Sequence, residues 1–328
     1  MKLSGATILI TGGTGSFGNR VAARLLAESP REIRILSRDE KKQWEMRQEF
    51  PDFRYIIADV REPDALYRAL QGVDVVFHAA ALKQVPSCEN YPWEAFRTNT
   101  QGSQNVCEMA LRSGTRMVVA LSTDKAVKPV NAMGMSKAMM EKIVCAQNQF
   151  AGQTTFCCVR YGNVMGSRGS VIPLFQRMIE QGLPLPLTVP HMTRFLMTLD
   201  KSVDLVLHAM TSAVGGEIFV RKAPACTVLD LARAMVRKYS RLGEGHPLET
   251  VGIRPGEKIH EVLVNEYEMS RASEDPTFFT VHPEYRARAD VGRREPGEEY
   301  TSERAERVSS FEAISSLLDQ MGRVELYT

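Results

Sequence analysis

Short apolar runs rich in β-branched residues alternate, over the first half of the chain, with longer segments in which apolar residues recur every three or four positions. The short runs are typical of buried strands, and the longer segments of helices with one apolar face. The pattern predicts strands at residues 7–10, 33–36, 54–58, 73–78, 117–122 and 154–159. It predicts helices between them at residues 19–26, 41–50, 64–70, 99–113 and 132–150. This order indicates an α/β fold, a doubly wound parallel sheet covered by helices on both faces.

The regular alternation ends after about Gly166. Beyond it, helical spacing returns in separate stretches, at residues 171–181, 201–211, 228–239 and 311–321. Residues 284–306 are rich in Arg and Glu and poor in apolar side chains, which favours a solvated surface segment.

Composition and charge exclude several classes of protein. The chain has 328 residues with 41 Lys and Arg against 39 Asp and Glu, a balance that argues against a nucleic-acid partner. No run approaches 18 apolar residues, and the apolar N-terminus leads into glycines instead of a cleavage site, so we expect no membrane insertion. The six cysteines show no C-x-x-C spacing, which indicates neither a metal site nor a disulfide framework. We expect a soluble, cytoplasmic protein.

A glycine-rich segment, Thr11-Gly12-Gly13-Thr14-Gly15-Ser16-Phe17-Gly18, lies between the first predicted strand and the first helix. Glycines at this spacing allow a tight turn, a close approach of the backbone to a pyrophosphate, and close packing of helix on strand. The helix N-terminus adds unpaired N–H donors for the phosphates. The sequence therefore predicts a dinucleotide site that includes Gly12, Thr14, Gly15, Ser16, Phe17 and Gly18.

The residues that end the second strand select between dinucleotides. An acidic residue there holds the ribose 2′-hydroxyl of NAD, whereas this chain has Ser37 and Arg38 before Asp39. A hydroxyl and a guanidinium suit the 2′-phosphate of NADP. The sequence favours NADP; the alternatives are that Asp39 still allows NAD, and that Arg38 is an ordinary surface cation.

Several segments together carry a resemblance to a known family. The wide glycine spacing, Ser122-Thr123-Asp124 and Lys137 resemble an extended short-chain dehydrogenase/reductase. Over residues 3–270 the chain resembles the 5-inverting UDP-N-acetylglucosamine 4,6-dehydratases, which make 6-deoxy-4-keto sugars for polysaccharide and flagellin modification. The segments that carry this resemblance are residues 78–86, 121–126, 160–164, 168–173 and 192–195.

The resemblance implies a domain organisation and an assembly. It implies a Rossmann-type NADP-binding domain over residues 1–165, with elements near 196–222 returning to it. A smaller C-terminal substrate-binding domain with a tail would then occupy residues 166–328. It further implies a homo-oligomer such as a hexamer, with UDP-N-acetylglucosamine or a close UDP-hexosamine as substrate.

The chain departs from the wider superfamily at one catalytic position. The superfamily pattern is Tyr-x-x-x-Lys, but here Met133 stands four residues before Lys137, and a thioether has no proton to exchange. The segment 131–142 is very similar to capsular-polysaccharide dehydratases that begin UDP-N-acetyl-L-fucosamine synthesis, a branch that has Met at this place and is active. An inactivating replacement of Tyr by Met is the alternative.

Dehydration requires oxidation at C4, loss of water across C5–C6 and return of hydride to C6. By the resemblance, Asp124 is the acid for the C6 hydroxyl, and Lys125 is the base at C5 that can return the proton to the other face. Nearby positive charge, from Lys137 and a bound nicotinamide, predicts a lowered pKa for Lys125. The alternative is a surface ion pair on a strand-end loop.

The base for the C4 hydroxyl stays open between Lys125, Lys83 and a water held by Thr123. The resemblance assigns Lys137 to the nicotinamide ribose, and His78 is interpreted as a sheet-end residue. Further cofactor contacts are expected from Asp59, Val60, Ala79, Ala80, Ala81, Asn99, Tyr161 and Asn163. Substrate contacts are expected from Lys83, Asn163, Arg168, Ser170, Val171, Arg194, Arg254 and Glu257.

Three functions remain distinct at this point. The first is NADP-dependent 4,6-dehydration of UDP-N-acetylglucosamine with inversion at C5, with epimerisation at C3 left open. The second is a UDP-sugar 4-epimerase of the same fold, which returns hydride to C4. The third is a catalytically silent subunit that binds the nucleotide sugar without converting it.

Overall fold

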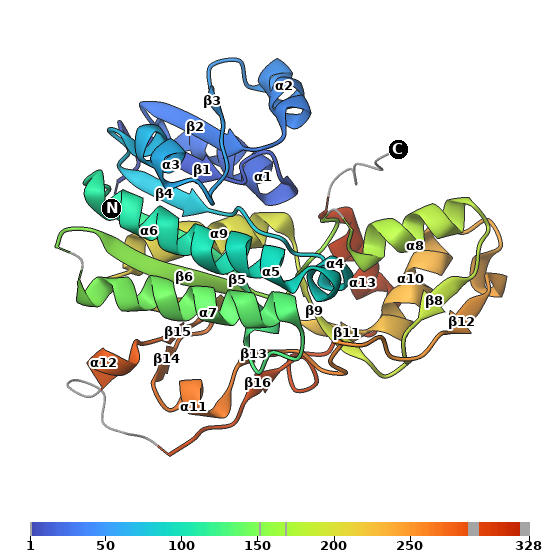
Figure 1. Ribbon diagram of the computed structural model, residues 1–328. Helices are drawn as coiled ribbons and strands as arrows, with labels where there is room; N and C mark the ends of the chain where they lie inside the picture. The colour runs from blue at the N-terminus through green and yellow to red at the C-terminus, as the bar shows by residue number, and fades with distance from the viewer. Residues whose placement is uncertain (1, 151, 168, 288–294, 322–328) are drawn as a thin grey trace.

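The computed structural model describes residues 2–150, 152–167, 169–287 and 295–321. Its centre is a nine-stranded sheet in the order β14-β15-β10-β6-β5-β4-β1-β2-β3 (Figure 1). The seven strands from β3 to β10 are mutually parallel, and β15 and β14 add an antiparallel edge. The strands are β1 Thr7–Thr11, β2 Glu32–Ser37, β3 Arg54–Ile57, β4 Val75–His78, β5 Met117–Thr123, β6 Thr155–Tyr161, β10 Ile218–Arg221, β14 Ala272–Glu274 and β15 Phe278–Val281.

Helices cover both faces of this sheet, as the alternating pattern predicts. On one face α3, α6 and α7 bury Leu66, Val106 and Met140 against the strands. On the other, α1, α2 and α9 bury Val21 and Val206 with their neighbours (Figure 1). The elements are α1 Ser16–Leu25, η1 Leu26–Glu28, α2 Glu40–Glu49, α3 Pro63–Leu70, α4 Val85–Asn90, α5 Pro92–Ala95, η2 Phe96–Gln101, α6 Gly102–Arg112, η3 Asp124–Ala126, α7 Ala132–Ala146, η4 Gln147–Gln149 and α9 Leu199–Ser212.

A second apolar core lies in the later part of the chain, where α8, α10 and α13 pack together around Phe175, Met235 and Ile314. Short sheets accompany it: β11-β9-β7, β12-β8 and β13-β16. The elements are β7 Asn163–Val164, α8 Val171–Glu180, β8 Leu185–Leu187, β9 Thr193–Met197, β11 Ala225–Thr227, α10 Val228–Tyr239, η5 Gly243–Gly245, β12 Leu248–Thr250, β13 Val262–Val264, α11 Glu266–Met269, α12 Glu284–Ala287, β16 Tyr300–Thr301 and α13 Phe311–Asp319.

The doubly wound α/β fold is confirmed, one expected helix proves to be irregular at its start, and one local expectation is wrong. The helix expected at 99–113 begins as a π-helical segment, η2, and becomes an α-helix at Gly102. The segment 284–306 is not a solvated surface throughout, because β16 pairs with β13 and Ser302 is fully buried. Its high charge concealed a short buried strand.

Candidate active site

The glycine-rich turn after β1 presses against the loop that follows β4. Gly12 has a φ of +66°, and a Cβ there would lie 2.7 Å from the Ala80 Cα. A Cβ on Gly18 would lie 2.4 Å from the Gly13 carbonyl oxygen, so helix and turn also pack closely. Gly15 caps α1 without any side-chain hydrogen bond, which leaves the first-turn N–H groups available. This cradle fits a dinucleotide pyrophosphate.

The side chains at the end of β2 differ in how they are engaged. Ser37 is buried, and its hydroxyl accepts a hydrogen bond from Gln43 (3.1 Å). Asp39 caps α2, accepting from the Lys42 N–H (3.0 Å). The Arg38 side chain is 52% exposed and lies 3.4 Å from Asp59. Burial acts to raise the pKa of Asp59, but the hydrogen bonds from Arg61 and the charge of Arg38 outweigh burial and lower it.

Some of the other expected cofactor residues make contacts within the protein itself. The Asn99 side chain is fully buried. Its Oδ1 accepts a hydrogen bond from the Leu82 N–H (2.8 Å), and its Nδ2 donates to the Leu82 carbonyl (2.9 Å). Val60 packs against Gly102, where a Cβ would come within 2.8 Å of it. The remaining residues, Thr14, Ser16, Ala79 and Ala81, lie in the turn after β1, the first turn of α1 and the loop after β4.

One aromatic contact spans the mouth of the cradle. The ring of Phe17, in the first turn of α1, stacks on that of Tyr161 at the end of β6, with centroids 6.1 Å apart and planes 17° apart. Burial raises the pKa of Tyr161. The two predicted cofactor residues thus lie together.

Asp124, which is fully buried, and Lys125, whose side chain is 22% exposed, form a pair at the end of β5. Lys125 Nζ lies 3.0 Å from Asp124 Oδ1, which also accepts from the Thr123 hydroxyl (2.9 Å). Burial raises the pKa of Asp124. The second oxygen, Asp124 Oδ2, is buried and has no hydrogen-bond partner among the described residues. A raised pKa brings a carboxyl closer to the range in which it can act as a proton donor.

The expectation of a lowered pKa for Lys125 is wrong. Burial does act to lower it, but the charges of Asp124 and Glu261 outweigh burial and raise the pKa of Lys125. Glu261 Oε1 lies 3.3 Å from Lys125 Nζ, and Glu261 was not among the predicted site residues. It lies four residues after Glu257, which was predicted to contact substrate, and this proximity was the available signal.

Two further cations surround Glu261. Lys258 Nζ lies 3.7 Å from its Oε2, and Arg194 Nε lies 4.0 Å from its Oε1. Arg194, expected to contact substrate, is mostly buried and also donates to the carbonyls of Thr193 (2.7 Å) and Ile259 (3.1 Å). The site therefore brings Arg194 to the Asp124–Lys125 pair.

Lys137 and Met133 lie on the first half of α7. Lys137 Nζ donates to the Leu121 carbonyl (2.6 Å) and contacts Met140 Sδ (3.1 Å), and burial lowers its pKa to about 8. Met133 is buried in a small apolar cluster with Cys88 and Ala95. The thioether thus fills space in the protein core.

His78 behaves as a sheet-end residue. Its ring nitrogens lie 2.7 Å from the Thr11 hydroxyl and 2.8 Å from the Ser103 hydroxyl. Burial, with a smaller effect from the charge of Lys137, lowers the pKa of His78 to about 3. The neutral imidazole therefore ties β4 to β1 and α6.

The expected substrate residues divide into two groups. Asn163, Ser170, Val171 and Arg194 line one small cavity of about 20 Å³. Asn163 Oδ1 and Ser170 Oγ are buried there and have no hydrogen-bond partner among the residues that the structure describes. The others lie on loops: Lys83 and Arg254 are exposed, Glu257 is half-buried, and Arg168 falls outside the described residues.

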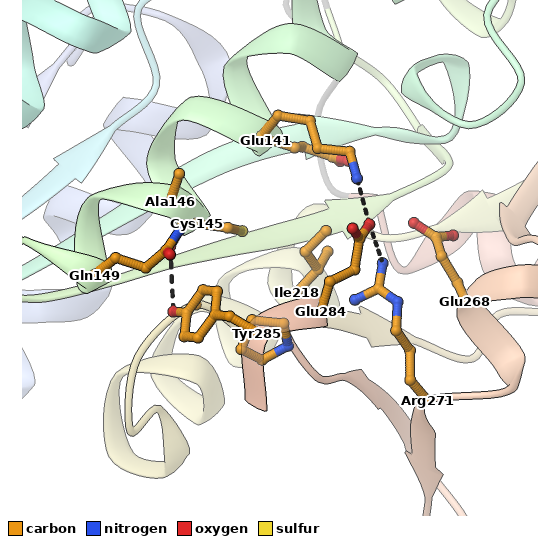
Figure 2. Close-up of a pocket in the computed structure, with 12 residues that line it drawn as sticks. Glu141, Cys145, Ala146, Gln149, Ile218, Glu268, Arg271, Glu284 and Tyr285 are labelled. Atoms are coloured by element: carbon orange, nitrogen blue, oxygen red, sulfur yellow. Dashed lines mark hydrogen bonds and ion pairs between the residues drawn. The ribbon is translucent and has the colours of Figure 1, made fainter. Parts of the chain in front are cut away.

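A separate cavity of about 330 Å³ lies beside the second half of α7 (Figure 2). At its edge Glu284 pairs with Lys142 (2.7 Å) and Arg271 (3.8 Å). The Tyr285 hydroxyl donates to the Cys145 carbonyl (3.3 Å). No predicted site residue lines this cavity.

Two searches of the described residues concern other kinds of site. Within residues 2–321, apart from the gaps given above, no three His, Cys, Asp or Glu side chains are grouped as metal ligands. Over the same residues, no helix has the length and apolar character needed to cross a membrane.

Comparison with known proteins identifies the family. Residues 8–283 match the model of the family described as polysaccharide biosynthesis protein. The chain is 50% identical over 283 residues to a UDP-glucose 4-epimerase of Rickettsia massiliae, covering 84% of this chain and 82% of that one. It is similar to the structure of Pen from Bacillus thuringiensis, with a TM-score of 0.90, 36% identity and coverage of 98% and 99%.

The fold is shared more widely. A dTDP-glucose 4,6-dehydratase of Streptomyces venezuelae with NAD bound has a TM-score of 0.70 at 22% identity, covering 89% of this chain and 92% of that one. The fold is thus that of extended short-chain dehydrogenases/reductases, and the chain belongs to the polysaccharide biosynthesis protein family.

Proposed function

We propose that the protein is an NADP-dependent UDP-N-acetylglucosamine 4,6-dehydratase that inverts C5. The observation that carries this is the buried Asp124–Lys125 pair, in which a carboxyl with a raised pKa lies 3.0 Å from an amine. A 4,6-dehydratase needs an acid and a base of this kind at C6 and C5, whereas hydride exchange at C4 alone needs neither.

The dinucleotide would be held by the cradle of Gly12, Gly15 and Gly18, with Lys137 toward the nicotinamide ribose. When bound, it supplies the acceptor for hydride from C4 and the donor of hydride to C6. Arg38, half-exposed at the end of β2, favours a 2′-phosphate and therefore NADP. The orphaned oxygens of Asn163 and Ser170 suit donors on a UDP-sugar.

The resting pair needs one proton transfer to become reactive. With Lys125 an ammonium and Asp124 a carboxylate, moving one proton across the 3.0 Å hydrogen bond produces a neutral carboxylic acid and a neutral amine together. Burial favours this exchange, because it removes two charges from a low-dielectric site. Asp124 then protonates the departing C6 hydroxyl, and Lys125 takes the C5 proton.

The C4 hydroxyl needs a base that Met133 does not supply. The Thr123 hydroxyl already donates to Asp124 and accepts from the Lys125 N–H (3.4 Å). Lys83 lies exposed on the loop that leads to α4. We favour Lys125 for this step as well, since it lies at the end of β5, where a sugar would meet the nicotinamide. The ammonium formed must then release the C4 proton to solvent, which its 22% exposed side chain can reach, before the amine takes the C5 proton.

The test is incubation of the purified protein with UDP-N-acetylglucosamine and NADP in D₂O, followed by mass spectrometry and proton NMR. We expect a product lighter by one water, with a 6-methyl signal, deuterium at C5 and the L-arabino configuration. Enzyme that binds NADP and the UDP-sugar tightly but converts neither would instead identify the silent subunit.

A UDP-sugar 4-epimerase is the second candidate, because relatives with half of their residues identical bear that name. The same incubation separates the two. An unchanged mass with inverted configuration at C4 would establish the epimerase and refute the dehydratase.

A further inference from the structure

We propose that Glu261 is a positioning residue for Lys125: its carboxylate orients the amine and opposes loss of its proton. This inference rests on the proposed function for its catalytic meaning, but its physical content concerns only the charge and placement of one side chain. No sequence motif assigned a role to Glu261. It lies directly before β13, far along the chain from β5.

The contact geometry places Lys125 between two carboxylates. Its Nζ lies 3.0 Å from Asp124 Oδ1 and 3.3 Å from Glu261 Oε1. The charged groups that face it are therefore Asp124 on its own element, Glu261 before β13, Arg194 on β9 and Lys258 on the loop before Glu261. Glu261 is the member that contacts all three cations.

The backbone of Glu261 is held on both sides. Its N–H donates to the Ser302 hydroxyl (2.9 Å), and its carbonyl accepts from the Ser302 N–H (2.8 Å). Ser302 is fully buried, and its hydroxyl also lies 2.7 Å from that of Thr193. A carboxylate on such a fixed backbone has a defined direction, which a flexible lysine needs in order to meet one carbon atom.

The loop that ends at Glu261 also rests on the segment after β5. The Asn131 side chain donates to the Gly256 carbonyl (2.8 Å), and Lys258 Nζ donates to the Val127 carbonyl. Asn131 also caps α7, the helix that carries Lys137. The loop, the Lys125 segment and α7 thus form one connected unit.

The charge of Glu261 has a predictable effect on both members of the pair. It stabilises the Lys125 ammonium, and it disfavours the Asp124 carboxylate. Replacing it by a neutral group therefore lowers the pKa of both groups. An opposite charge at this distance shifts a pKa by about 1–3 units.

The first experiment compares the pH dependence of C5 deuterium exchange in wild type, Glu261→Gln and Glu261→Asp. We expect both limbs of the Glu261→Gln profile to move to lower pH, by about 1–3 units. Glu261→Asp keeps the charge and should leave the limbs near the wild-type positions with a reduced rate. A lower exchange rate in Glu261→Gln with both limbs at the wild-type pH would overturn the proposal, because Glu261 would then act only through packing.

The second experiment uses no substrate, so that it stands apart from the proposed function. Lys125 has a side chain 22% exposed, and competitive labelling with acetic anhydride read by mass spectrometry reports the pKa of single amines. We expect the Lys125 labelling curve to move to lower pH in Glu261→Gln. Glu266→Gln is the matched control, because Glu266 pairs with Lys128 (2.8 Å), three residues from Lys125.

The outcomes separate the two proposals. A shifted Lys125 curve without any dehydrated product supports the placement of Glu261 and refutes the dehydratase. A dehydrated product with an unshifted curve refutes the role of Glu261 alone. If Glu261→Gln does not fold, Glu261→Asp still decides. This variant keeps the negative charge, so its Lys125 labelling curve should stay near that of wild type. A curve that coincides with that of the denatured protein would contradict a role for the charge.

Discussion

Replacing Arg160 with methionine should destabilise the protein by about 3–5 kcal/mol. Arg160 on β6 is fully buried and bonds two carboxylates, with Nη2 2.6 Å from Glu141 Oε2 and 2.8 Å from Glu268 Oε1. Its Nη1 also donates to the Leu263 carbonyl (2.8 Å). One guanidinium thus joins the central sheet to α7, α11 and β13, the strand that Glu261 precedes.

The magnitude follows from what the substitution leaves behind. Methionine fills much of the volume, so the cavity cost is small, but Glu141 and Glu268 stay buried without the guanidinium that pairs with both. Removing one partner of a buried ionic network costs about 3–5 kcal/mol. With an unfolding entropy of about 2.1 cal/mol/K per residue over 328 residues, the melting temperature should fall by roughly 4–7 °C.

The assay is chemical and thermal unfolding of Arg160→Met beside Arg20→Met. Arg20 makes a close pair with Asp200 (2.6 Å), but its side chain is 49% exposed, so its loss should cost less than about 1 kcal/mol. Equal small effects of the two substitutions would refute the reasoning, because burial would then make no difference. Recovery of stability in Arg160→Met with both glutamates made Gln would confirm that uncompensated charge is the cause.

Three further predictions concern the cofactor cradle and acid stability. Gly12→Ala should weaken NADP binding at least about tenfold in a fluorescence titration, because its Cβ meets the Ala80 backbone; Gly5→Ala, also at positive φ but with open space around it, should not. Arg38→Gln should lower NADP affinity about tenfold or more and leave NAD affinity unchanged; equal losses for both would contradict a 2′-phosphate role. Burial acts to raise the pKa of Glu268, but Arg160 outweighs burial and lowers it from the ordinary value of 4.5. The free energy of unfolding in urea should therefore be highest above about pH 4.5 and fall as the pH is lowered further. This fall should be less steep in Glu268→Gln.

The fold and the dinucleotide cradle follow from local signals. Each strand of the parallel sheet is a short apolar run, and each turn residue that matters, such as Gly12, Arg38 or Asp124, stands directly after such a run. Because parallel strands end at one edge of the sheet, chain order alone brings these residues together. Periodicity did not reveal the π-helical η2, although it did predict a helix from Asn99 onward.

Glu261 could not be found in the same way. Its partner Lys125 lies more than a hundred residues earlier, and the contact depends on how β13 pairs with β16, a strand of two residues in a charged segment. The wrong direction predicted for the pKa of Lys125 arose because only cations, Lys137 and a bound nicotinamide, were counted, whereas the adjacent Asp124 and the distant Glu261 both raise it. The contribution of Glu261 is a long-range charge contact, which has no local pattern in the sequence.

The two candidate activities share their first half. Oxidation at C4 uses the cradle, Lys137 and the end of β5 in either case, so similarity to epimerases over those elements does not distinguish the reactions. The distinction falls on the groups that face C5 and C6. An epimerase has no use for an acid there, whereas a dehydratase does, and the desolvation of a buried carboxyl costs stability in either enzyme. The carboxyl with a raised pKa, Asp124, and the three cations around Glu261 all lie at the end of β5. This is the place where a dehydratase must provide its acid and its base.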